Sequence, residues 1–120
     1  MLIYVCSPYG GLQKNYENAV EYCKWVVQEG HIPVASHVML HKILIDDCPI
    51  QRKQGLTAGL ALTEIADEVW LFGDKITHGM AGEIAHAAKI GIPVISFLGV
   101  REWEEAVGSE LLKVALLERA

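Results

Sequence analysis

Four short apolar runs alternate with segments of helical periodicity along this chain, and this alternation constrains its fold more than any other feature. The runs are residues 1–6, 31–35, 68–72 and 92–97. Continuous apolar runs of this length are typical of strands buried on both faces, and strands separated by helices form right-handed βαβ units. The sequence therefore predicts an α/β fold, a flavodoxin-like or Rossmann-like three-layer sandwich whose parallel four-stranded sheet has the order 2-1-3-4.

Amphipathic spacing predicts the helices between and after these strands: 14–29, 50–65, 79–90 and 101–117, with one further helical turn at 39–45. No repeat, linker or low-complexity segment interrupts the 120 residues. A single domain over residues 1–120 is therefore expected.

Composition and charge narrow the classes of function. The 10 Lys and Arg residues are scattered in a chain of net charge −5, which argues against binding a nucleic-acid polymer. No apolar run approaches the ~20 residues of a membrane span, and the N-terminus lacks the features of a signal peptide, so a cytoplasmic protein without membrane contact is expected. Cys6, Cys23 and Cys48 show no CxxC spacing and are expected to be small buried or half-buried thiols.

The predicted strand order places a ligand site between the first and third strands, beyond their carboxyl ends. Two glycine-bearing loops, 6–11 and 73–79, should meet there. In the first loop Ser7 offers a hydroxyl, and Gly10 and Gly11 allow backbone N–H groups to approach a ligand. The helix N-terminus that follows favours an anion. Because the loop matches neither a Walker A motif nor GxGxxG, an ordinary strand-to-helix turn is an equal alternative.

The second loop leads into a helix that carries Glu83 in its first turns. Asp74 and Thr77 precede that helix. Gly79 and Met80 begin it, so these four residues are candidate substrate contacts. A carboxylate near a helix N-terminus is kept ionised, which suits a nucleophile, and glycines on the approach to Glu83 leave room for a ligand. The alternative is a solvent-facing glutamate that complements the helix dipole.

Tyr9, His37 and a pair of aspartates are further candidate contacts. Tyr9 can stack on a ring or cap the sheet. His37 and His41 stand at i,i+4 spacing close to Asp46 and Asp47. No further ligand has a defined spacing, so neither a metal nor another cofactor is expected. His37 and the aspartates are instead candidates for contact with ribose hydroxyls or a leaving base, and a hinge with solvated aspartates is the alternative.

Three stretches carry a family resemblance: IYVCSPYGG, GHIPVASH and the most specific, DEVWLFGD…THGMAGEIAHAAKIGIPV. They resemble the nucleoside 2-deoxyribosyltransferase superfamily, including its deoxynucleoside monophosphate glycosidase branch and short phage and prophage relatives. The resemblance implies that Glu83 attacks C1′ of the sugar, that Tyr4 orients Glu83, and that the loop after the first strand holds sugar or phosphate. The implied chemistry is retaining, with a glycosyl-enzyme resolved by water or a second base.

In the implied reaction a group must protonate the leaving base, and here the sequence departs from this family at two positions. Transferases commonly carry an aspartate six residues before the nucleophile, where this chain has Thr77; the monophosphate glycosidases tend to carry a hydroxyl residue there. Thr77, together with Ser7 and Gly11, therefore favours a nucleotide substrate. An acidic residue early in the helix before the third strand is also missing, and Asp46 or Asp47 is the candidate to replace it.

The leading hypothesis is a small N-glycosidase or deoxyribosyltransferase-like enzyme that acts on a nucleoside or a nucleoside 5′-monophosphate. The alternative is a non-catalytic module that binds a nucleotide or a nucleotide-derived signal in the same crevice. A phosphoribohydrolase of the cytokinin-activating type is a weaker interpretation, because its PGGxGT-type loop is absent. A homo-oligomer is expected, with Trp103, Leu111 and Leu117 or the ridge 56–62 as candidate interfaces.

Overall fold

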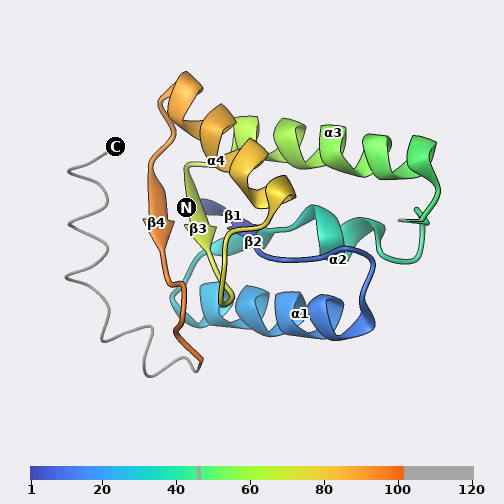
Figure 1. Ribbon diagram of the computed structural model, residues 1–120. Helices are drawn as coiled ribbons and strands as arrows, with labels where there is room; N and C mark the ends of the chain where they lie inside the picture. The colour runs from blue at the N-terminus through green and yellow to red at the C-terminus, as the bar shows by residue number, and fades with distance from the viewer. Residues whose placement is uncertain (46, 102–120) are drawn as a thin grey trace.

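The computed structural model describes residues 1–45 and 47–101, and Figure 1 shows how its elements are arranged. The elements are β1 (Leu2–Cys6), α1 (Gln13–Gln28), β2 (Ile32–Val34), α2 (Ser36–Leu40), α3 (Pro49–Ile65), β3 (Glu68–Leu71), α4 (His78–Ile90) and β4 (Val94–Ser96). The four strands form one parallel sheet of order β2-β1-β3-β4. The predicted fold class and strand order are confirmed.

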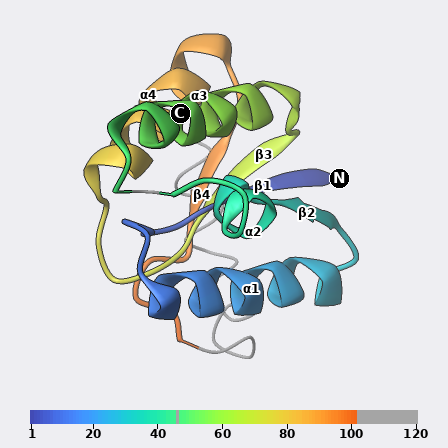
Figure 2. The ribbon, with the colours of Figure 1, turned by 90° about the vertical axis from the view of Figure 1, so that its right-hand side faces the viewer.

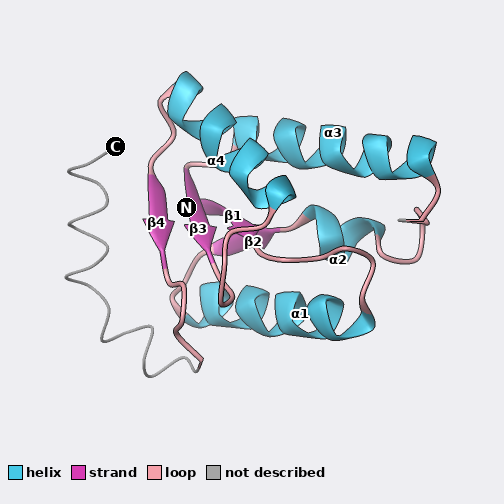
Figure 3. Ribbon diagram, in the orientation of Figure 1, coloured by secondary structure: helices cyan, strands magenta, loops and turns pink. Residues whose placement is uncertain are grey.

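Helices cover both faces of the sheet. α1 lies on one face, and α3 and α4 lie together on the other (Figure 2). α2 follows β2 directly and lies between α1 and α3 (Figure 3). The carboxyl ends of the central strands are therefore surrounded by helices that can contribute side chains to a site.

Alternating side chains of β1 divide the core into two parts. Ile3 and Val5 belong to the apolar cluster on the α1 side, which includes Trp25. Tyr4 and Cys6 belong to the cluster on the side of α3 and α4. Successive strand residues point to opposite faces of a sheet. The hydroxyl and the thiol of β1 therefore share the face that carries α4.

Helix α4 has well-defined ends. Thr77 is its N-cap, and the Thr77 hydroxyl oxygen accepts a hydrogen bond from the Met80 backbone N–H at 3.3 Å. Gly91 ends the helix in the left-handed conformation, with φ 80°, where a glycine carries no Cβ penalty. Together these signals fix α4 between β3 and β4, with its N-terminus at the carboxyl end of the sheet.

The outer strands and the short second helix differ from the sequence-based expectation. β2 and β4 are three residues each, shorter than the runs 31–35 and 92–97. Among the described residues, both lie at an edge of the sheet and pair on one side only, so their ladders end sooner. α2 begins before the helical turn expected at 39–45, because the Ala35 carbonyl already accepts from the N–H groups of Val38 and Met39. A further turn follows within the expected range, where the Leu40 carbonyl accepts from the N–H groups of Ile43 and Leu44.

Some expectations concern residues outside the described ranges. The helix predicted at 101–117 and the interface residues Trp103, Leu111 and Leu117 lie there, so they stay predictions. In the ridge 56–62, Leu56 is 45% exposed, and the proposed homo-oligomer also stays a prediction. Among the helices of residues 1–45 and 47–101, none is long and apolar enough to cross a membrane.

Candidate active site

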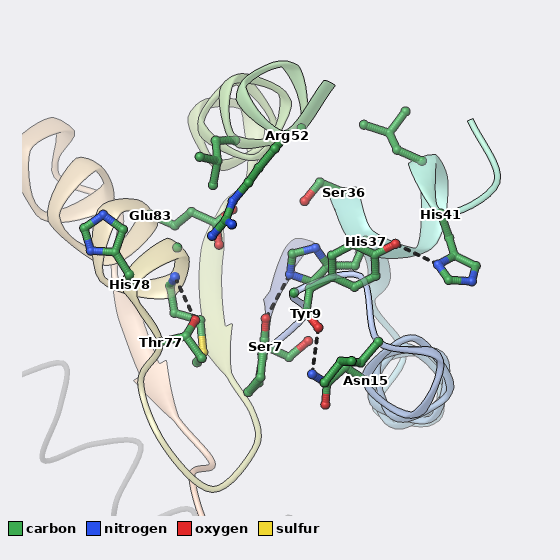
Figure 4. Close-up of a pocket in the computed structure, with 18 of the residues that line it drawn as sticks. Ser7, Tyr9, Asn15, Ser36, His37, His41, Arg52, Thr77, His78 and Glu83 are labelled. Carbon is green, nitrogen blue, oxygen red and sulfur yellow. Dashed lines mark hydrogen bonds between the residues drawn. The ribbon is translucent and has the colours of Figure 1, made fainter. Parts of the chain in front are cut away.

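A pocket of about 290 Å³ opens at the carboxyl end of the sheet, and Figure 4 shows the side chains that line it. Its walls come from the loop after β1, the loop between β3 and α4, and helices α1 to α4. The two glycine-bearing loops thus line one pocket, as the position of the switch point predicts.

Gly73 brings these two loops into contact. It has φ 109°, in the region that favours glycine, and a Cβ atom at Gly73 would lie 2.7 Å from Pro8 Cδ. A larger residue would therefore push apart the β1 loop and the start of the β3–α4 loop. Gly73 is required by geometry at the point where the two halves of the pocket join.

Glu83 lies at the bottom of the pocket and is only 6% exposed. Tyr4 donates its hydroxyl proton to Glu83 Oε2 at 2.5 Å, and the Cys6 thiol donates to Glu83 Oε1 at 3.3 Å. Because the Tyr4 proton is directed at Glu83, the Ser36 hydroxyl donates to the Tyr4 oxygen at 3.0 Å. The carboxylate is thus held by two residues of β1, and Ser36 of α2 supports one of them.

Burial has the largest effect on the pKa of Glu83. Loss of hydration raises the pKa of Glu83, and the hydrogen bonds from Tyr4 and Cys6 lower it to a smaller extent. Burial thus opposes the helix N-terminus, which was expected to keep this group ionised, and the solvent-facing alternative is excluded by the same burial. Burial and the adjacent Glu83 raise the pKa of Tyr4 well above its ordinary value, so Tyr4 stays a neutral donor.

Gly59 of α3 makes room for this arrangement. A Cβ atom at Gly59 would overlap Glu83 Oε2 and would lie 3.1 Å from the Tyr4 hydroxyl. By contrast, a Cβ atom at Gly79 would make ordinary contact with Leu56, and one at Gly82 would meet no atom within 4 Å. The space for the Glu83 carboxyl group thus comes from Gly59 of α3.

Ser7 brings an unpaired polar atom to the pocket. The residue is 1% exposed, and its Oγ has no hydrogen-bond partner in the part of the chain that the structure describes. Its carbonyl accepts a hydrogen bond from His37 Nε2 at 2.8 Å, which ties the β1 loop to α2. A buried hydroxyl without a partner is uncommon, and a bound ligand would satisfy it.

Rings of the β1 loop and of α2 with its C-cap form one wall of the pocket, and Tyr16 of α1 packs against this wall. Tyr9 and His37 stack with their ring centroids 4.6 Å apart, and Tyr16 stacks on His41 at 3.9 Å. The Tyr9 hydroxyl and His41 Nδ1 share a hydrogen bond of 2.7 Å, and Asn15 Nδ2 donates to the Tyr9 carbonyl at 2.7 Å. Figure 4 shows Tyr9 held between these neighbours, so its ring is fixed before any ligand binds.

Comparison with known proteins gives a family without an assigned function. The family model described as a domain of unknown function (DUF7768) matches residues 1–97. The chain belongs to this family. No curated protein matches the sequence.

Among solved structures, a protein of known activity has a fold similar to that of the DUF7768 domain. A 2-deoxyribosyltransferase from the psychrotolerant bacterium Bacillus psychrosaccharolyticus is similar, with a TM-score of 0.67 and 17% sequence identity. The alignment covers 88% of this chain and 90% of the transferase chain. At this level of identity the likeness shows that the two proteins share a fold over nearly their whole lengths.

Most of the predicted site residues line the pocket of the DUF7768 domain. Those in its walls are Ser7, Tyr9, Gly10, His37, Thr77, Gly79, Met80 and Glu83. Tyr4 lies behind Glu83 and reaches it by its hydroxyl. Their roles toward a substrate stay predictions.

Three predicted residues do not line the pocket, and a fourth is not among the described residues. Gly11, Asp47 and Asp74 are exposed and outside its walls, and Asp46 lies outside the described residues. Asp74 lies 3.7 Å from Arg101. Asp47 lies in the turn before α3. None of the described residues between His41 and Pro49, where α3 begins, lines the pocket.

Sequence reasoning missed several contributors to the pocket of this DUF7768 domain. Arg52 of α3 extends into the pocket on the side of Glu83 (Figure 4). Sequence reasoning had given it no role. Lys75, Ser36 and Asn15 were also missed. Their polarity within otherwise amphipathic segments was the available signal, but it did not distinguish a pocket wall from an exposed face.

The described walls carry more positive than negative charge. Arg52 and Lys75 are the Lys and Arg residues among them, and Glu83 is the one Asp or Glu. Within residues 1–45 and 47–101, no three His, Cys, Asp or Glu side chains come together as a metal site would require. The pocket thus combines one buried carboxyl group with cationic side chains nearer its mouth.

Proposed function

We propose that this DUF7768 domain cleaves or transfers the N-glycosidic bond of a nucleoside or a nucleoside 5′-monophosphate, with Glu83 as the nucleophile. The observation that carries the proposal is a buried carboxyl group at the bottom of a pocket, oriented by Tyr4 from the central strand β1. The likeness of fold to a 2-deoxyribosyltransferase supports membership of the wider nucleoside 2-deoxyribosyltransferase superfamily.

The reaction follows retaining glycosyl chemistry. A Glu83 oxygen forms a bond to C1′ of the sugar as the bond from C1′ to the base nitrogen breaks, and that electron pair leaves with the base, which takes up a proton. Water or a second base then attacks C1′ and releases the Glu83 carboxylate, losing its proton. Tyr4 holds the carboxylate for the first step, because its hydroxyl hydrogen bond fixes one of the two oxygens.

A phosphorylated substrate agrees best with the charges in the pocket. Arg52 and Lys75 offer positive charge, and the buried Ser7 hydroxyl offers an unused hydrogen-bonding group in the same pocket. Thr77 caps α4 through its oxygen and keeps its hydroxyl proton for a ligand. These features favour a nucleoside 5′-monophosphate over a free nucleoside.

One observation favours a second candidate, a non-catalytic module that binds a nucleotide. In the described part of the chain no second carboxyl group lines the pocket, so an acid that protonates the leaving base is not supplied by Asp or Glu there. Asp47, the predicted candidate, is exposed in the turn before α3. Binding in this pocket without base release is the behaviour that this second function predicts.

One experiment separates the two functions. The purified protein is incubated with a panel of nucleosides and 5′-monophosphates, free base is measured by chromatography, and binding of each compound is measured by calorimetry. Release of base from at least one compound supports the enzyme. Saturable binding of a monophosphate without base release over a long incubation overturns the enzyme and supports the binding module.

A further inference from the structure

We propose that Cys6 is a positioning residue for Glu83: its thiol holds one carboxylate oxygen while the Tyr4 hydroxyl holds the other. The catalytic meaning of this role rests on the proposed function, but the contact itself does not. Cys6 is 0% exposed, and its sulfur lies 3.3 Å from Glu83 Oε1. The sequence had indicated only a small buried apolar group at this position.

The geometry follows from the register of a central strand. Tyr4 and Cys6 are two residues apart on β1, so their side chains point to the same face of the sheet. Tyr4 is paired with β2 on one side of β1 and with β3 on the other, and Cys6, at the end of β1, is paired with Leu71 of β3. Two donors on a rigid strand can hold a carboxylate in one orientation more firmly than either donor alone.

Cys6 acts in this role as a protonated thiol. Burial, followed by the negative charge of Glu83, raises the pKa of Cys6 well above its ordinary value. The sulfur therefore keeps its proton and donates a hydrogen bond to Glu83 Oε1. A thiol is a weak donor, so the bond from Cys6 complements the stronger bond from Tyr4 without matching it.

Few other groups act directly on the Glu83 carboxylate. Among the described residues, Tyr4 and Cys6 are the two side chains that hydrogen-bond to Glu83. The other titratable or charged side chains that share its pocket are His37 and His41 of α2, Arg52 of α3, Lys75 of the β3–α4 loop and His78 of α4. The ion pairs of the described residues do not include Glu83, so a change at Cys6 is expected to act through the thiol contact.

Removing the thiol should make Glu83 harder to ionise. In Cys6→Ala the charged carboxylate loses a hydrogen bond, and its titration midpoint should rise by about 0.5 pH unit. In Cys6→Ser a donor returns, and the midpoint should lie closer to that of the wild-type protein. Cys23→Ala is the matched control, because Cys23 is a half-buried thiol of α1 that packs against the apolar cluster on the opposite face of the sheet.

The test is a carbon-13 NMR titration of the Glu83 carboxyl group in the wild-type protein and the three variants, with Glu83→Gln used to assign the signal. The titration midpoint of Glu83 should be higher in Cys6→Ala than in the wild-type protein. In Cys6→Ser it should return at least part of the way, and in Cys23→Ala it should match the wild type. Equal midpoints in Cys6→Ala and the wild type would overturn the role of Cys6. So would a rise of equal size in Cys23→Ala.

Turnover gives a second readout that separates this role from the proposed function. If the wild-type protein releases base, the acidic limb of its kcat/KM profile should move to higher pH in Cys6→Ala and return toward the wild-type position in Cys6→Ser. If the wild-type protein releases no base, the proposed reaction fails. The titration of Glu83 still decides whether Cys6 positions the carboxylate, because it requires no turnover.

Discussion

Gly59 of α3 lies directly against Glu83 of α4, and a methyl group at Gly59 would occupy the position of the Glu83 Oε2 atom. Glycine inside a helix costs about 1 kcal/mol relative to alanine. Helix α3 thus carries an unfavourable residue at the position where the buried carboxyl group needs space. Thr63, one turn later, donates a hydrogen bond from its hydroxyl to the Gly59 carbonyl at 2.8 Å.

Gly59→Ala should displace Glu83 and disturb its bond to Tyr4. Overpacking of this kind should lower the free energy of unfolding by about 1–3 kcal/mol. A misplaced nucleophile should lower base release by on the order of 100-fold. Urea denaturation and a base-release assay measure the two effects.

Gly82→Ala on α4 is the control for Gly59→Ala. Gly82 is exposed, and an added Cβ atom would meet nothing within 4 Å. This substitution should raise stability by about 0.5–1 kcal/mol, because alanine is the better helix former. Similar losses in both variants would show that the space at Gly59 has no special relation to Glu83.

The raised pKa of Glu83 predicts a particular dependence of stability on pH. Between the ordinary glutamate pKa of about 4.3 and the higher value in the folded protein, the folded state binds more protons than the unfolded state. The contribution of Glu83 to stability should therefore fall as the pH rises through this window, by at most about 1.4 kcal/mol per pH unit. Glu83→Gln should remove this loss, as chemical denaturation from pH 4 to pH 8 would measure. Parallel curves for the two proteins would contradict the prediction.

Substitution by alanine should affect ligand binding at Ser7 and stability at Ser36. The Ser7 hydroxyl has no partner within the described chain, so Ser7→Ala should leave thermal stability nearly unchanged and weaken mononucleotide binding by about tenfold. Ser36→Ala removes a buried donor to Tyr4 and should cost about 1 kcal/mol of stability. Calorimetry and thermal denaturation test both, and a large loss of stability in Ser7→Ala would contradict the assignment of its hydroxyl to a ligand.

Arg52 should discriminate between phosphorylated and free nucleosides. Arg52→Met should weaken binding of a 5′-monophosphate by about tenfold, with a smaller effect on the free nucleoside. The effect should shrink as salt increases, because Arg52 is exposed. Lys53→Met is the matched control, since Lys53 is the next residue of α3 and does not line the pocket. An equal loss for both ligands, or in both variants, would remove Arg52 from phosphate recognition.

Much of the fold and part of the site were predictable, because they depend on local pattern. The alternation of apolar runs with amphipathic segments predicted the sheet order, and the switch-point rule then placed the two glycine-bearing loops together. Glu83 was found by its place after the second loop. Tyr4 was supported by the family resemblance, and the structure adds the hydroxyl contact between the two residues.

The remaining contributors depend on distances between elements that no local pattern contains. Gly59 was interpreted as part of a packing ridge, because sequence gives its helical face but not the side chain opposite. Cys6 was interpreted as a small buried or half-buried apolar group, because its contact with Glu83 cannot be read from the sequence either. The aspartate expected to act as an acid, Asp47, depended on the path of an irregular turn, and α3 begins too soon after it to carry it into the pocket.

The central claim is that Glu83 is the nucleophile, and its most direct test is base release by Glu83→Gln. The control is Glu21→Gln, since Glu21 is an exposed residue of α1 that pairs with Lys24 away from the pocket. With the best substrate of the panel, Glu83→Gln should lose base release by on the order of 1,000-fold or more while still binding the ligand, and Glu21→Gln should match the wild-type rate. Base release by Glu83→Gln at the wild-type rate would contradict the account.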